Sequence, residues 1–377
     1  MVTANAYYIH PIIGEVAQHF GVDEGEIGIV PALNQLALAL GILLLLPLGD
    51  RYSNRALCLA FVAMQTLFMG MMALAEGFGA FTIASTLLGF VTIAPYLIPA
   101  FASKRVAPER LGEVTALLTA GVIFGILVAR VGAGIVAEAY GWRAVYFCAF
   151  ALMVVVTLAL PLVLRSEGTV PKQASGSYFS LIASVFTLAR AHRDMMISAV
   201  IQSLNFSTFT ASWLAIALHL TSDKLGYGVD TVGFLAGIAA ISIISTPRIG
   251  VWADKVGARK ARVIAAIVQC AGAALFYPMG WSVWTLMVPL IVLNFVGPSI
   301  DVTGRMTFLA LDPAIRTRLS TSYIVLMFIG GAAGSLIGTQ VYAAGGWAGT
   351  SVLMLAVSLT ILALSVWAWR RELSGDP

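Results

Sequence analysis

Residues 250–262 read GVWADKVGARKAR, and residues 46–57 read LPLGDRYSNRAL. Each stretch lies between two long apolar runs and carries one aspartate followed by basic residues. Other features recur about 205 residues apart along the chain: Ile27-Gly28 with Val232-Gly233, Pro108 with Pro313, and Gly141-Trp142 with Gly346-Trp347. These recurrences predict that the chain contains two copies of one ancestral unit.

The composition predicts a protein that lies in lipid. Of the 377 residues, 59% are hydrophobic and 11% are charged, and the mean hydropathy is +0.92. A soluble domain carries about 25% charged residues, so this chain has too few polar residues to cover its apolar surface in water. We therefore expect membrane lipid as its solvent. The net charge of +4 does not indicate nucleic-acid binding, because the basic residues lie at the ends of apolar runs.

The apolar runs predict twelve transmembrane helices, since about 20 apolar residues cross the hydrocarbon core. The predicted spans are 1–19, 26–48, 56–76, 79–102, 111–137, 142–164, 194–220, 230–248, 263–280, 283–303, 319–343 and 350–369. The long polar interval 165–193 divides them into an N-terminal half, 1–164, and a C-terminal half, 194–377, joined by a cytoplasmic linker with an amphipathic stretch. The first span opens at Met1, and alignment with the second copy predicts that it lacks its cytoplasmic half.

The basic residues support this count and set the orientation. With the even-numbered helices ending in the cytoplasm, 19 of the 22 Lys and Arg residues fall inside, and the other three are Arg130, Arg143 and Lys224. Such a bias orients membrane proteins with the basic loops in the cytoplasm. We therefore expect a multi-pass protein of the bacterial inner membrane with both termini cytoplasmic in the full-length form.

The two loop stretches resemble the signature of the major facilitator superfamily, G-x-L-A-D-R-x-G-R-[KR]. The second copy matches at Gly250, Asp254, Lys255, Gly257 and Arg259. The first copy keeps three of these positions and has Leu46 and Ser53 where the signature has glycine; the three are Asp50, Arg51 and Arg55. An aspartate at a helix end can accept hydrogen bonds from amides at the N-terminus of a neighbouring helix or pair with an arginine. We interpret these eight residues as a cytoplasmic gate; ordinary charged loop residues are the alternative.

The resemblance extends to a bacterial branch related to arabinose and drug efflux permeases, on ANAYYIHPIIGEVAQHFGV (residues 4–22) and on the spans around 121–147 and 311–338. It implies an all-helical fold of two pseudo-symmetric six-helix halves around a central cavity. Two motifs linked to coupling in the family are absent: span five lacks the Gly-Pro pair of the antiporter motif, and span four has Ser85 in place of an arginine.

Arg130 is the most informative single residue. It lies seven residues before Ala137, about 10 Å from the outer end of its span at 1.5 Å per residue. A charge at that depth is costly unless it faces a cavity or a partner. It could bind an anion or substrate, pair with an acid such as Glu15, or reach the interface as a structural arginine.

In this fold, spans one, four, seven and ten usually line the cavity. Together with Arg130 and the polar residues of span two, they give the candidate cavity residues Tyr7, Tyr8, His10, Asn34, Tyr96, Arg130, Gln202, Asn205 and Asp301. His10 could carry a proton or be a hydrogen-bonded helix-end histidine. Asp301 lies four residues before Arg305, so the two could also form a helix-end ion pair.

These patterns predict a secondary active transporter that moves a small molecule by alternating access, with proton-coupled efflux (an antiporter) favoured. An uptake symporter, a uniporter and a non-transporting receptor or scaffold are the alternatives. We do not expect an enzyme, a cofactor or a bound metal, because the chain has no clustered catalytic groups, no metal-spaced cysteines and no phosphate-binding loop. A small-molecule substrate, protons and lipid are the expected partners, nucleic acid is not, and the expected state is a monomer.

Overall fold

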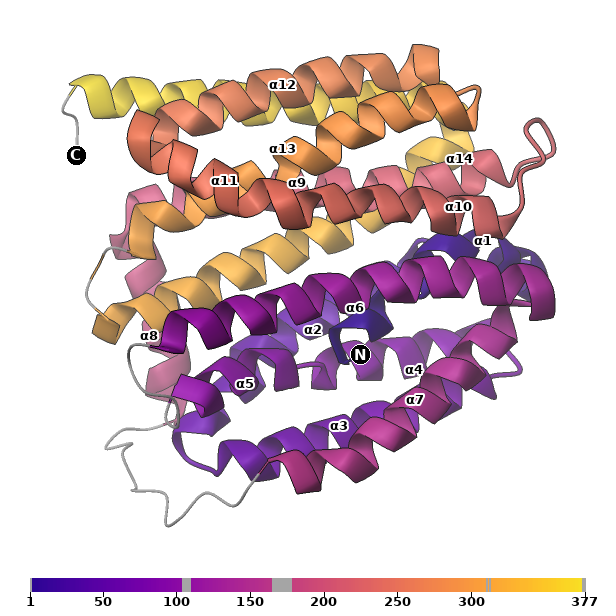
Figure 1. Cartoon of the computed structure of the whole chain (residues 1–377), viewed down its shortest axis with the longest axis horizontal. Coiled ribbons are helices and arrows are strands. Elements are labelled where there is room, and N and C mark those ends of the chain that lie inside the picture. Colours follow the sequence, from indigo (N-terminus) through magenta and orange to yellow (C-terminus); the bar gives the residue numbers. More distant parts are fainter. Residues whose placement is uncertain (1, 104–109, 165–177, 310, 312, 375–377) are drawn as a thin grey trace.

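The computed structural model describes residues 2–103, 110–164, 178–309, 311 and 313–374, and within these residues the regular structure is entirely helical. Long helices lie side by side in two bundles, one formed by the first part of the chain and one by the second (Figure 1). This arrangement confirms the expected all-helical membrane fold.

The first bundle contains η1 (Val2–Ala6), α1 (Ile9–Phe20), α2 (Ile29–Leu45), η2 (Leu46–Asp50), α3 (Asn54–Ala73), α4 (Phe78–Val91), α5 (Ala94–Ser103), α6 (Leu111–Tyr140) and α7 (Trp142–Val163). The second contains α9 (Arg193–Leu220), α10 (Val229–Ala236), η4 (Gly237–Ala240), α11 (Ile241–Val256), α12 (Ala258–Met279), α13 (Val283–Leu309) and α14 (Pro313–Ser374). Between them lies α8 (Tyr178–Ala191), the amphipathic part of the predicted linker, whose first tyrosine donates its hydroxyl to the carbonyl of Leu44.

Nine helical stretches within the described residues are long and apolar enough to cross a membrane. One of them, Arg318–Arg371, is two helices joined at Gly346, where φ is 57° and ψ is −150°. α9 is 28 residues long but carries many polar residues, and α1 has 12 residues, or about 18 Å at 1.5 Å per residue. Counting these two and dividing α14 gives the twelve predicted positions.

The predicted fourth span is broken into α4 and α5. Pro95 lies in the first turn of α5, where its missing N–H costs no hydrogen bond within the helix. Thr92 leaves helical geometry with ψ at 52°, and its hydroxyl donates to the carbonyl of Leu88 at 2.6 Å. The break thus coincides with Pro95, whereas α11 and α13 continue through prolines of their own.

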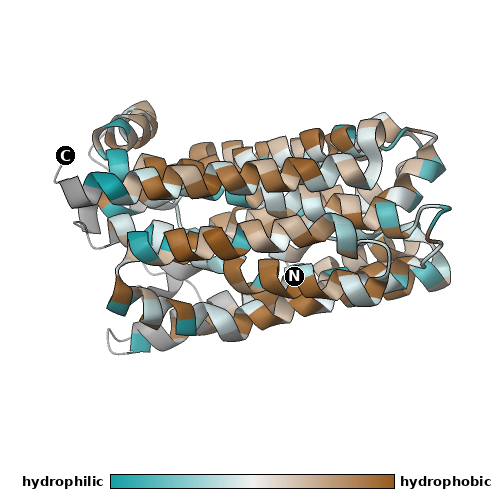
Figure 2. Ribbon diagram, turned by 90° about the horizontal axis from the view of Figure 1, so that it is seen from above, coloured by the Kyte–Doolittle hydropathy of each residue, from teal (hydrophilic) through white to brown (hydrophobic). Residues whose placement is uncertain are grey.

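Hydrophilic residues gather at the two ends of the bundles, and hydrophobic residues lie between them (Figure 2). We call the end with Arg51, Arg55, Lys255 and Arg259 the basic end. The opposite end has the turns after α1, α3, α6, α9 and α12, and we call it the acidic end. In Figure 1 the basic end is on the left.

The two bundles meet through matching contacts at the acidic end. Ser335 of α14 donates its hydroxyl to the carbonyl of Gly28 at 2.8 Å, and a Cβ on Gly28 would collide with Thr339. Gly134 of α6 meets Gly233 of α10, where a Cβ on Gly134 would lie 2.9 Å from the Gly233 Cα. Shifting each position by 205 residues converts the Gly28–Thr339 contact into the Gly233–Gly134 contact. The duplication seen in the sequence is thus also present in the packing between the bundles.

The acidic ends of both bundles carry the same pair of aromatic residues. Gly141 has a φ of 81° and Gly346 a φ of 57°, and a buried tryptophan follows each glycine. Trp142 packs edge-on against His19 at 5.2 Å between ring centroids, and Trp347 stacks on His219 at 4.3 Å. Positive φ costs glycine little, so the chain can reverse between two helices and bring each tryptophan into the core.

Candidate functional site

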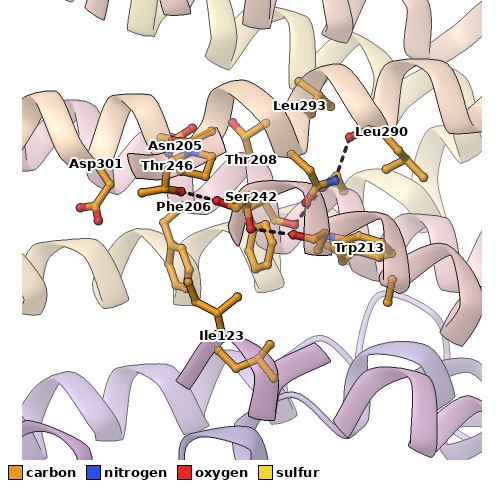
Figure 3. A pocket seen from close by; sticks show the side chains of 18 of the residues that line it. Ile123, Asn205, Phe206, Thr208, Trp213, Ser242, Thr246, Leu290, Leu293 and Asp301 are labelled. Atoms are coloured by element: carbon orange, nitrogen blue, oxygen red, sulfur yellow. Dashed lines mark hydrogen bonds between the residues drawn. The ribbon is translucent and has the colours of Figure 1, made fainter. Parts of the chain in front are cut away.

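A cavity of about 420 Å³ lies at mid-depth between α6 and the second bundle (Figure 3). Its apolar lining includes Phe206, Phe209 and Trp213 of α9. Its polar lining consists of amides, hydroxyls and two charged residues: Arg130, Gln202, Asn205, Thr208, Ser212, Ser242, Thr246, Gln269, Asn294 and Asp301. Cavities of this size with few polar groups hold small organic ligands in many proteins.

Several polar side chains of the cavity already bond to protein. Asn205 donates to the Gln202 side chain and to the carbonyl of Gly297, both at 3.1 Å, which connects α9 to α13. Asn294 donates to the carbonyl of Leu290 at 2.8 Å within α13. By contrast, Gln269 of α12 is buried with no partner for its Oε1 in the described part of the chain. An unpartnered buried acceptor at a cavity wall is available to a ligand.

Arg130 is buried in an aromatic surround at the cavity wall. Its guanidinium carbon lies 4.7 Å from the ring centre of Trp213, 4.9 Å from that of Phe209 and 5.4 Å from that of Tyr7. Its Nη2 lies 2.6 Å from Nδ1 of His10, and its Nε has no hydrogen-bond partner among the described residues. Because an arginine N–H can only donate, His10 accepts this bond at Nδ1 in its neutral form.

This environment offsets a large part of the cost of burying the charge. A charged side chain at the centre of a membrane helix costs at least about 2.5–3.5 kcal/mol, and each cation–π contact returns about 0.5–2 kcal/mol. α6 continues to Tyr140, which places Arg130 about 15 Å from the end of the helix at 1.5 Å per residue. The cation is therefore held at a depth where a negatively charged ligand would interact with it strongly.

Two acids that could have faced Arg130 are engaged elsewhere. Glu15 of α1 accepts a hydrogen bond from the backbone N–H of Trp142 at 3.0 Å. Asp301 accepts from Nε of Arg305 with both carboxylate oxygens at 3.0 Å, in the i,i+4 pair that the spacing allowed. Arg305 in turn lies 5.1 Å from the ring centre of Tyr323. The negative charge of Asp301 is thus neutralised within its own helix.

The structure places the other predicted cavity residues outside the lining. Tyr7 contacts Arg130 with its ring, and His10 accepts a hydrogen bond from Arg130. Tyr8 belongs to the apolar core near the acidic end. Asn34 joins α2 to α4 by donating to the Ser85 carbonyl at 2.6 Å, and Tyr96 packs at the rim of a second core. The predicted lining residues Arg130, Gln202, Asn205 and Asp301 do surround the cavity.

The predicted gate residues lie at the basic end, where the arginines bond mostly within one bundle. Arg55 donates from Nε to the carbonyl of Leu164 at 2.6 Å, and Arg259 pairs with Asp194 at 2.6 Å. Arg51 lies 5.8 Å from the ring centre of Tyr178. In α11, Gly250 is internal, Asp254 and Lys255 are exposed, and Gly257 ends the helix with a φ of 91°. Asp50 ends η2, and its side chain lies outside the described residues.

Sequence reasoning missed part of the lining. Ser242 and Thr246 are four residues apart on α11 and face the cavity together, as do Phe206 and Phe209 on α9. A polar stripe at helical spacing in an apolar run was the available signal. Gln269 gave no such signal, because one amide in an apolar helix does not reveal which neighbour it faces. Within the described residues no group of three potential metal ligands comes together.

The comparisons with known proteins agree with this geometry. The sequence profile of the Major Facilitator Superfamily matches residues 1–297 and 195–376. The chain belongs to the major facilitator superfamily. It is 26% identical to the uncharacterized transporter YgaY of Escherichia coli O157:H7 across 98% of this chain and 92% of that protein. It is also 26% identical to the multidrug resistance protein MdtG of Klebsiella pneumoniae, over 86% of this chain and 79% of that one.

A solved structure with the same fold is that of a bacterial homologue of the human lysosomal transporter Spinster, in an inward-facing, unoccupied conformation. The TM-score is 0.77 over 99% of this chain and 95% of that one, at 13% sequence identity. Like its relatives, this family member is therefore a transporter of a small molecule and not an enzyme.

Proposed function

We propose that the protein is a secondary active transporter that exports its substrate by alternating access, driven by the proton gradient. The cavity between α6 and the second bundle carries this proposal, because it lies at mid-depth between two halves that meet through matching contacts. Folds of this kind work by rocking one half against the other around such a site. Export is supported by the 26% identity to a multidrug resistance protein.

The conformation described here is closed at the acidic end. The Ser335–Gly28 hydrogen bond and the Gly134–Gly233 approach join the bundles there, as does the bond from the Val229 N–H to Glu138 at 2.9 Å. An exporter whose basic end lies in the cytoplasm takes up its substrate while the acidic end is closed in this way. Gly250, Asp254, Lys255, Gly257 and Arg259, with Asp50, Arg51 and Arg55, form the gate at that end in this proposal.

Growth and vesicle assays test transport and its direction. The full chain is expressed in an efflux-deficient bacterial host, and growth inhibition by a compound library is compared with that of cells carrying Asp254→Asn. Any compound to which the wild type gives resistance is then assayed in everted vesicles with and without a pH gradient, acid inside. Accumulation that needs the gradient supports proton-coupled export. Equal counterflow without a gradient points to a uniporter, and higher sensitivity of expressing cells points to uptake.

A further inference from the structure

The chemistry around Arg130 narrows the class of substrate. A guanidinium has five N–H donors and stays protonated at any physiological pH. In this structure one nitrogen, Nη2, is bonded to His10, while Nε has no partner in the described residues. The ring centres of Tyr7, Phe209 and Trp213 lie within 5.4 Å of the guanidinium carbon, but no hydrogen bond satisfies Nε. An anionic ligand would supply the acceptor that Nε lacks.

The rest of the cavity favours an anion over a cation. Its second charged residue, Asp301, has both carboxylate oxygens bonded to Arg305, so a cationic ligand would have to compete with that pair. Arg130 has no carboxylate partner within the described residues. The uncompensated charge at the cavity wall is therefore positive.

The apolar part of the lining indicates what the anion is attached to. Phe206 and Phe209 lie nearly parallel, with ring centres 5.6 Å apart and an interplanar angle of 14°. They and Trp213 form the aromatic part of the lining, and the guanidinium carbon of Arg130 lies 4.9 Å from the ring centre of Phe209 and 4.7 Å from that of Trp213. Aromatic ligands pack well against such rings.

We infer that the cavity binds organic acids in which a carboxylate, or another singly charged acidic group, is attached to a planar apolar body. The acid group accepts hydrogen bonds from Arg130, and the body packs on Phe206, Phe209 and Trp213. Gln269 supplies an unpartnered acceptor for a polar group of the ligand. This inference rests on the proposed transport function for the fate of the ligand, but binding is measured without transport.

The test uses pairs of ligands that differ in charge alone. Purified full-length protein in detergent at pH 7.5 is titrated with naphthalene-2-carboxylate, naphthalene-2-carboxamide and 2-(aminomethyl)naphthalene, and thermal unfolding is followed. A second set uses 3-phenylpropanoate and its amide. We expect each acid to raise the unfolding temperature with a midpoint at least ten-fold below that of its amide, and the amine to have the weakest effect.

Two arginine variants separate binding from structure. Arg130→Gln should raise the midpoint of the acid to that of the amide. Arg143→Gln is the matched control, because Arg143 also lies 4.7 Å from a tryptophan ring centre but donates to the carbonyls of Ala73 and Ala75. It should leave the acid-to-amide ratio unchanged. If Arg130→Gln does not fold, the comparison of acid and amide binding to the wild type still tests the inference.

Three results would overturn the inference: amides that bind within two-fold of their acids, an acid preference that persists in Arg130→Gln, or no response of the wild type to either acid. The proposed transport function fails separately. Acid binding without accumulation in vesicles would contradict transport and leave the binding inference intact. Gradient-dependent accumulation of neutral or cationic compounds alone would support transport and contradict the binding inference.

Discussion

Replacing Gly134 with alanine should shift the balance between the two conformations of the protein. A Cβ at this position would lie 2.8 Å from the carbonyl oxygen of Val229 and 2.9 Å from the Gly233 Cα. Both are backbone atoms of the opposite bundle. Because an ordinary van der Waals contact needs about 3.4 Å, α6 and α10 must move apart by about 0.5 Å. Overpacking of this kind costs about 1–3 kcal/mol. Alanine is also a better helix former than glycine, but that gain applies to both conformations and cancels.

The cost falls on the conformation that is closed at the acidic end. A destabilisation of about 1–3 kcal/mol changes the ratio of the two conformations by about 5- to 150-fold. Gly132→Ala on the same helix is the matched control, because a Cβ there would have nothing within 4 Å. It should change the ratio by less than about two-fold, since helix propensity acts equally on both conformations.

The ratio is measured through a cysteine in the cavity. Ser242 faces the cavity and is replaced by cysteine in a protein whose three natural cysteines, Cys58, Cys148 and Cys270, have been replaced. A membrane-impermeant thiol reagent is added to right-side-out or everted vesicles, and the two labelling rates are compared. Gly134→Ala should move labelling toward the acidic side. Equal rates in Gly134→Ala and Gly132→Ala would refute the reasoning.

Three further substitutions test the packing within the bundles by unfolding titration in mixed micelles. Arg55→Ala removes a bond to a carbonyl at the C-terminal end of α7 and should lower the free energy of unfolding by about 1 kcal/mol, because the side chain is only partly buried. Trp347→Phe removes a buried N–H hydrogen bond to α12 at 3.1 Å and should lower the free energy of unfolding by about 1–3 kcal/mol. A loss below 0.5 kcal/mol, roughly the scatter of such data, would contradict the structural role of this bond. Asp194→Asn breaks the ion pair with Arg259. Because the Asp194 side chain is 58% exposed, we expect the free energy of unfolding to fall by less than about 1 kcal/mol. A larger loss would show that this pair is stronger than a typical surface pair.

Most of the fold could be read from the sequence because the thickness of the bilayer sets the length of each apolar run. The runs, the basic loops and the duplication together predict twelve helices in two copies. The break between α4 and α5 falls next to Pro95, but the apolar run continues through it. Because α13 stays helical through Pro289 and Pro298, a proline alone did not predict this interruption.

The site could be predicted in part. Arg130 is recognisable because a charge inside an apolar run is costly whatever surrounds it. Its neighbours were not predictable, because the packing of α1 and α9 against α6 brings residues 120 positions apart into contact. Glu15, one of the alternatives considered as a partner, bonds instead to the Trp142 N–H, one of the free amides at the N-terminus of α7. The Asp301–Arg305 pair was predictable, since its i,i+4 spacing is local.

Distances between spin labels at both ends of the molecule test whether its two halves alternate between two conformations. One pair of labels replaces Glu76 and Lys224 at the acidic end, and another replaces Tyr52 and Lys260 at the basic end; all four positions are exposed. In lipid nanodiscs we expect two populations related by opposite changes: when the acidic-end distance lengthens, as in Gly134→Ala, the basic-end distance shortens. Distances that change in the same direction at both ends, or that do not change at either, would contradict alternating access around a shared cavity.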